Sequence, residues 1–173
     1  MPVCEIKDDN VLVDRAVIFN DQEIKYLDND EVVIYNLLKG LSHNSMFEIK
    51  YEDKNIIYRV KSLECKIDYE DDVIKVKVNM VGNLNEIDNL VLNKDVISSL
   101  TKIIEETVTK RVNSLLEVFT SNNIDVLGLK KIIYNKTKRK EKSINDIKFK
   151  VNTDINIERQ EVLFNSIEGS NEI

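Results

Sequence analysis

The sequence has no tryptophan, one proline, four glycines, one histidine and two cysteines in 173 residues. Four glycines are too few for a phosphate-binding loop, in which glycines let the backbone approach the phosphates. His43 stands alone between serines and asparagine, without the partners that a hydrolytic triad or a zinc site requires. Cys4 and Cys65 do not make a disulfide framework. The sequence therefore offers no candidate catalytic, cofactor-binding or metal-binding residues.

Long apolar runs are absent too, and no segment approaches the roughly 18–20 residues of a membrane-spanning helix. No signal peptide is evident, and Cys4 follows only three residues, so we do not expect it to be lipidated in this chain. Cys65 lies on an apolar strand face, which predicts a small core residue. The hydrophobic content of 42% is typical of a soluble globular protein. We expect one domain over residues 1–160 and a polar, frayed tail over residues 161–173.

The charge is acidic overall but unevenly placed. The chain has 31 acidic and 25 basic residues, so its net charge is −6. This acidic net charge argues against a nucleic-acid partner. Residues 130–142 carry +6, because Glu141 alone opposes seven cations: Lys130, Lys131, Lys136, Lys138, Arg139, Lys140 and Lys142. This basic segment predicts either a solvated helix whose C-terminal cations complement its dipole, or contact with lipid headgroups or an acidic partner.

Carboxylate pairs elsewhere are predicted to be turn residues. Asp71-Asp72 and similar pairs lack the ligand spacing and the glycine of a calcium loop. Asp28 or Asn29 is a suitable N-cap for a short helix over residues 30–39, with Gly40 as its stop.

The first third of the chain predicts a hairpin before that helix. Residues 11–19 are rich in β-branched side chains, and the apolar run Ala16-Val17-Ile18-Phe19 predicts burial on both faces. Residues 20–23 form a turn, and residues 24–27 return as the second arm.

A meander of three strands follows, over residues 47–51, 56–67 and 74–84. In the second strand the apolar side chains change parity after Val60, so we predict a bulge near Lys61-Ser62. Gly82 predicts a bulge or close packing. The side chains of the third strand that face the core are Ile74, Val76, Val78, Met80 and Leu84.

An amphipathic helix is predicted over residues 93–121, roughly 44 Å long, with Asn93 as its N-cap. Its apolar side chains step by three and four along one stripe. A turn at residues 122–125, a shorter helix built around residues 126–129, the basic segment and a strand over residues 149–157 complete the chain. A strand that returns after two helices is expected to run parallel to its neighbour. The predicted fold is α+β: a mostly antiparallel, mixed sheet of about five or six strands, with one long helix and shorter helices packed on it.

Taken in order, these segments resemble the C-terminal domain of the Ger(x)C family, the C subunit of bacterial spore germinant receptors. The similarity covers roughly residues 5 to 160 and rests on the order and spacing of several short motifs. They are Ala16-Val17-Ile18-Phe19-Asn20-Asp21, Lys25-Tyr26-Leu27-Asp28, Leu38-Lys39-Gly40, the lysine/valine-alternating residues 74–84 ending in Gly82-Asn83-Leu84, Asn123-Ile124-Asp125-Val126-Leu127-Gly128 with Tyr134, and Phe149-Lys150-Val151.

The resemblance implies a non-enzymatic lipoprotein that is a subunit of the receptor and acts in nutrient-triggered germination. It further implies association with the A and B subunits of the receptor, which are embedded in the membrane. The protein itself would act on the outer face of the spore inner membrane. We expect the chain to be the excised C-terminal domain of a lipid-anchored protein, or else a naturally short relative. Two rival hypotheses stay open: a module that holds a small nutrient or lipid between helix and sheet, and a small enzyme.

Overall fold

A computed structural model of the chain describes residues 2–7, 10–19, 24–42, 44–85, 92–138 and 143–158. Within these residues the fold is α+β, as predicted, with seven strands, three α-helices and one 3-10 helix. His43 and residues 161–173 lie outside them. The elements are β1 (Pro2–Lys7), β2 (Asn10–Phe19), β3 (Ile24–Leu27), α1 (Asn29–Leu38), β4 (Met46–Tyr51), β5 (Lys54–Glu70), β6 (Val73–Asn85), α2 (Lys94–Ser121), α3 (Leu129–Thr137), η1 (Ile144–Asp146) and β7 (Lys148–Ile157).

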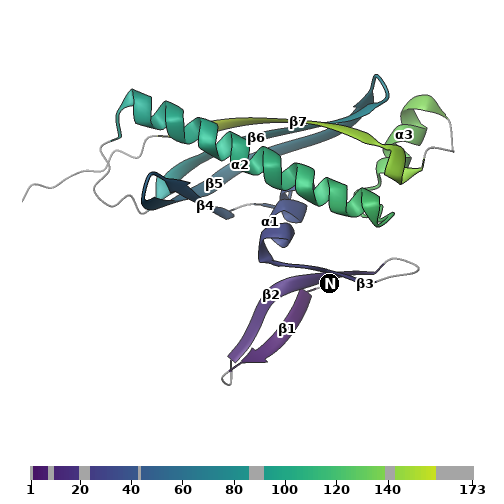
Figure 1. The fold of residues 1–173 in the computed structure, drawn as a ribbon, viewed down its shortest axis with the longest axis horizontal. Coiled ribbons are helices and arrows are strands. Elements are labelled where there is room, and N and C mark those ends of the chain that lie inside the picture. Colours follow the sequence, from purple (N-terminus) through teal and green to yellow (C-terminus); the bar gives the residue numbers. More distant parts are fainter. Residues whose placement is uncertain are drawn as a thin grey trace, which may run out of the picture.

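The strands form two sheets. Strands β4, β5, β6 and β7 lie in that order, and β7 runs parallel to β6 while the other neighbours are antiparallel. The predicted mixed character is therefore confirmed. The strands β1, β2 and β3 form a second, antiparallel sheet, and β1 was not predicted. In Figure 1, α1 follows β3 and lies between the small sheet and α2. The chain passes through α1 before it enters the larger sheet at β4, so this helix separates the two sheets.

One extra residue in β5 keeps both halves of this strand in register with the core. Its pairing with β6 shifts between Val60 and Ser62, which confirms the predicted bulge. Before the shift, Tyr58 and Val60 are buried, and after it, Cys65 and Ile67 pack against the same core. Since side chains alternate strictly along a strand, only an inserted residue allows both sets to face the same side.

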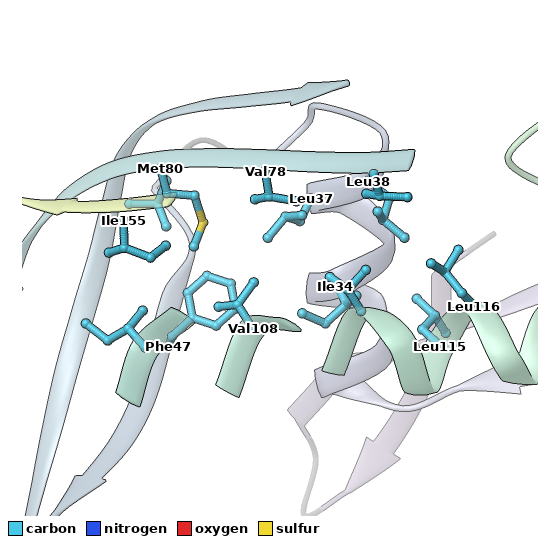
Figure 2. Close-up of a cluster of buried hydrophobic side chains, with 14 of the residues drawn as sticks. Ile34, Leu37, Leu38, Phe47, Val78, Met80, Val108, Leu115, Leu116 and Ile155 are labelled. Atoms are coloured by element: carbon cyan, nitrogen blue, oxygen red, sulfur yellow. The ribbon is translucent and has the colours of Figure 1, made fainter. Parts of the chain in front are cut away.

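The helix α2 lies across one face of the larger sheet (Figure 1). Asn93 caps it, since its side chain accepts a hydrogen bond of 2.9 Å from the amide of Val96. Figure 2 shows side chains from α1, α2, β4, β6 and β7 meeting in one apolar cluster. The buried side chains of α2 are Leu100, Ile104, Val108, Val112, Leu115, Leu116, Phe119 and Thr120. No helix in the described ranges is both long and apolar enough to cross a membrane.

The prediction that residues 16–19 are buried on both faces was wrong at Phe19. Val17 is buried, but Phe19 is 59% exposed and pairs with Ile24, which is 57% exposed. These two residues form the last pair of the ladder between β2 and β3. A continuous apolar run in the sequence does not reveal where the covering elements end.

Gly82 lies at a close approach between β6 and β5. A β-carbon at this position would lie 2.2 Å from the carbonyl oxygen of Arg59 and 2.7 Å from Cζ of Tyr58. The ring of Tyr58 is fully buried, and its hydroxyl donates to the carbonyl of Asn156 on β7 at 3.4 Å. Burial, together with the charge of Glu158, raises the pKa of this hydroxyl. The close-packing interpretation of Gly82 is thus confirmed, and the contact joins three strands.

Replacing Gly82 with alanine should destabilise the fold by about 1–3 kcal/mol, because the added methyl group must displace backbone or the Tyr58 ring. Urea unfolding followed by circular dichroism measures this. The matched control is Gly40→Ala, which meets open space and suffers only from its positive φ of 70°, at a cost of about 1 kcal/mol. A Gly82→Ala protein as stable as the wild type would contradict the close contact.

Candidate interaction surface

The candidate surface is built on α3 and begins at the turn that ends α2. Asn123 has a positive φ of 52°, and the amide of Ile124 donates back to the carbonyl of Phe119 at 2.7 Å. The side chain of Ile124 is buried. This hydrophobic anchor holds the turn against the core and directs the chain into α3.

The carboxylate of Asp125 holds the first turn of α3. It accepts hydrogen bonds from the backbone amides of Leu129, at 2.6 Å, and Lys130, at 3.1 Å. Gly128 precedes the helix in the left-handed conformation, with φ 73°, which glycine adopts at little cost. The prediction of a helix built around residues 126–129 was therefore wrong in its position, because the helix begins only at Leu129. Leu129 and Ile133 are buried, so the opposite side of this short helix faces solvent.

Lys136 ties α3 to the larger sheet. Its Nζ lies 3.0 Å from Oδ1 of Asp68 on β5. The hydrogen bond from Lys136, helped by that from the Tyr69 amide, holds the pKa of Asp68 below its usual value. Both side chains are more than half exposed, and pairs of this kind contribute little to stability. The pair shows that the last turn of α3 lies beside the open side of β5.

Lys138 and Tyr134 form the outer end of α3. The amide of Lys138 donates to the carbonyl of Tyr134 at 2.8 Å, and its Nζ lies 5.8 Å from the centroid of the Tyr134 ring. The ring is 40% exposed. A cation over an aromatic face that is open to solvent presents both charge and apolar area to a partner.

The seven predicted cations differ in their surroundings. Lys136, in the last turn, complements the helix dipole and pairs with Asp68, as expected for a solvated helix. Lys130 and Lys131 lie in the first turn, where a cation opposes the dipole, and both are exposed. Helix electrostatics therefore does not account for these two. Lys138 lies at the C-cap, while Arg139, Lys140 and Lys142 lie outside the described residues.

The turn carboxylates have structural partners, as the sequence indicated. Asp28 caps α1 in a reciprocal box: it accepts from the amide of Glu31 at 2.8 Å, and the Glu31 side chain accepts from the amide of Asp28 at 3.0 Å. Asp71 pairs with Lys75 at 3.2 Å, and Asp72 accepts from the Tyr69 hydroxyl. Within the described ranges, no cluster of three His, Cys, Asp or Glu side chains could hold a metal ion.

Cys65 lies half-buried on the core side of β5. Burial raises the pKa of its thiol from 9.0 to about 11. At neutral pH the side chain is therefore a protonated, weakly reactive thiol, in agreement with its predicted packing role.

Buried apolar side chains occupy the space between α2 and the sheet, which is where the ligand-binding hypothesis places a small nutrient or lipid. Val78, Met80 and Val108 meet there (Figure 2). Hollows lie instead at the margins of α2. One of about 410 Å³ lies between α1 and α2, with an apolar floor that includes Ile34 and a rim that includes Arg111. Another, of about 610 Å³, lies between α2 and β7, and most of the residues that line it are polar or charged.

The sequence did not predict the contact at the first hollow. Arg111 Nη2 lies 3.5 Å from Oδ2 of Asp30 on α1. The two residues are distant in sequence, and no motif joins them, because their proximity depends on how α1 packs against α2. Both residues line the hollow, so the ion pair places a positive and a negative charge at its rim.

Two comparisons with known proteins gave matches. The family model described as spore germination B3/GerAC like, C-terminal, matches residues 14–161. The fold is similar to that in the crystal structure of the GerBC protein, with a TM-score of 0.77 and 16% sequence identity over 92% of this chain. The match covers 56% of that chain, so the present chain spans little more than half of its length. No curated protein matches the sequence.

Asp125→Ala should destabilise the protein by about 1 kcal/mol, because two amides of the first turn of α3 lose their acceptor. Amide hydrogen exchange should become faster in α3 and stay unchanged in β6. The control is Asp146→Ala, which removes an exposed carboxylate from η1. Equal exchange rates in α3 for the variant and the wild type would contradict the capping role.

Cys65 should react with iodoacetamide about a hundredfold more slowly in the native protein than in urea at pH 8, when Cys4 is replaced by serine. The two-unit rise in pKa lowers the thiolate fraction by that factor. Since the folded state holds the proton more tightly, the contribution of Cys65 to stability is present below pH 9 and lost towards pH 11. Mass spectrometry of the labelled protein measures the rate, and equal rates would refute a buried thiol.

Proposed function

Because the chain belongs to the spore germination B3/GerAC like, C-terminal family, we propose that it is an interaction domain of a spore germinant receptor C subunit. The family match over residues 14–161 is the single observation that carries this proposal. The domain takes part in nutrient-triggered germination by holding other receptor subunits, and it catalyses no reaction.

The non-enzymatic role is supported by what the described side chains do. The carboxylates cap helices and turns, and the thiol of Cys65 is shielded. A packed platform is what remains: a long helix lies across a four-stranded sheet, and a basic helix packs beside it through the buried side chains of Leu129 and Ile133. Such a platform presents fixed surfaces to partners, which is what an interaction domain requires.

The proposed partners are the A and B subunits of the receptor, together with an anionic membrane surface. The full-length protein would be a lipid-anchored subunit on the outer face of the spore inner membrane. The exposed cations Lys130, Lys131 and Lys138 suit this setting, since each lysine near an anionic bilayer contributes about 1 kcal/mol of attraction. This attraction fades beyond a Debye length of about 8–10 Å, so α3 must approach its partner closely.

Reversing three charges tests the proposal in the full-length receptor. The variant K130E/K131E/K138E should reduce co-purification of the C subunit with the A and B subunits, or its retention on anionic vesicles, by about tenfold or more. The control K50E/K94E/K102E makes the same change of charge at exposed lysines on β4 and α2.

Germination itself provides a second readout. Spores that carry the triple variant should germinate more slowly in response to nutrient than spores with the control variant. Unchanged assembly and germination would return α3 to the role of a solvated helix. Intact germination after deletion of residues 93–160 would refute the proposed function as a whole.

A further inference from the structure

The open face of the larger sheet, opposite α2, carries lysines that stand directly against one another. In the strand register, Lys66 on β5 lies opposite Lys77 on β6, and Lys75 on β6 lies opposite Lys150 on β7. Lys148 lies two residues before Lys150 and so shares its face. We call Lys66, Lys75, Lys77, Lys148 and Lys150 the lysine ladder. Like charges in directly opposed positions destabilise a sheet, so folding alone does not favour this arrangement.

The ladder is open to solvent. Lys66, Lys77, Lys148 and Lys150 are exposed, and the side chain of Lys75 is 39% exposed. The alternate residues of β6, including Ile74 and Val76, are buried on the other face, which α2 covers (Figure 1). The chain thus concentrates positive charge on one side of a sheet while its net charge is −6.

Carboxylates border the ladder on two sides. Glu64 pairs with Lys66 at 2.7 Å, and Glu70 pairs with Lys75 at 2.5 Å. These hydrogen bonds raise the pKa of both lysines, so both stay charged. Lys77, Lys148 and Lys150 form no ion pair with another described residue. The β6 and β7 columns of the ladder are therefore positive at Lys77, Lys148 and Lys150. The β5 column alternates in sign, with Lys66 between Glu64 and Asp68.

This pattern favours a narrow, extended partner. Lys75 and Lys77, like Lys148 and Lys150, are two residues apart, which is about 6.8 Å along a strand, and neighbouring strands lie about 4.8 Å apart. An extended acidic segment presents alternate side chains at the same spacing of about 6.8 Å. A flat anionic bilayer would instead bring its headgroups against Glu64, Glu70 and Asp154 as well as the lysines.

We propose that the lysine ladder binds an extended acidic segment of a partner protein, with alternate carboxylates seated between the lysines of β6 and β7. The inference rests on the proposed function as an interaction domain and names the chemistry of one partner. The ladder also adjoins the basic helix, since Asp68 lies opposite Lys75 and accepts the contact from Lys136. A segment that leaves the ladder on this side would continue onto α3.

The test uses the complete 173-residue chain and a fluorescein-labelled peptide of alternating glutamate and threonine, about ten residues long to match β7. Fluorescence anisotropy should show binding at low salt and its loss at roughly 1 M salt, where the Debye length is about 3 Å. The variant K77E/K150E should weaken binding by at least about tenfold, and K77Q/K150Q by less. The control K94E/K102E, with the same change of charge on α2, should bind within about twofold of the wild type.

Three results would overturn the inference. The first is equal peptide binding by K77E/K150E and K94E/K102E, and the second is equal binding of a lysine–threonine peptide and the glutamate–threonine peptide. The third is that the protein sediments with vesicles containing roughly 30% phosphatidylserine but does not bind the glutamate–threonine peptide. Thermal unfolding confirms that each variant is folded, which is expected because Lys77 and Lys150 are exposed. If the peptide does not bind while co-purification with the receptor subunits persists, only this inference fails. If the peptide binds and co-purification is absent, the proposed function fails.

Discussion

The inserted residue between Val60 and Ser62 is the constraint on which the rest of the structure depends. It lets one 17-residue strand pair with β4 at one end and β6 along its length while its apolar side chains face the same core. Without it, every side chain on one side of the bulge would change face. The core beneath α2 would then lose either Tyr58 and Val60 or Cys65 and Ile67.

The same bulge determines the open face. After it, Lys66 and Asp68 point away from the core, where they lie opposite Lys77 and Lys75 of β6. Asp68 is then exposed on this face, where it pairs with Lys136 of α3, so this contact also depends on the register of β5. A single backbone irregularity thus couples the packing of the core to the charge pattern of the surface.

The distribution of charge is organised in space although the chain is acidic overall. Cations gather on α3 and on the open face of the larger sheet, and α2 covers the opposite face. Charges arranged in this way attract and orient an oppositely charged partner before contact, and they are sensitive to salt. Hollows at the margins of α2 are separate from these basic surfaces, and their rims carry charges of both signs.

The sequence by itself determined the elements that follow from local periodicity. The stripe of α2, the parity change in β5, the buried side chains of β6 and the caps of Asp28 and Asn93 all express preferences of neighbouring residues, and the structure contains each of them. The crossover through α2 and α3 likewise made the parallel pairing of β7 predictable.

Only the tertiary structure decided which distant segments meet. It divided the strands between two sheets, left Phe19 exposed, joined Arg111 to Asp30, and set Lys75 opposite Lys150. The physical reason is that periodicity specifies which face of a segment is apolar but carries no information about its partner. Register and covering elements follow from packing among segments far apart in the chain, and the charge pattern of the surface follows from that register.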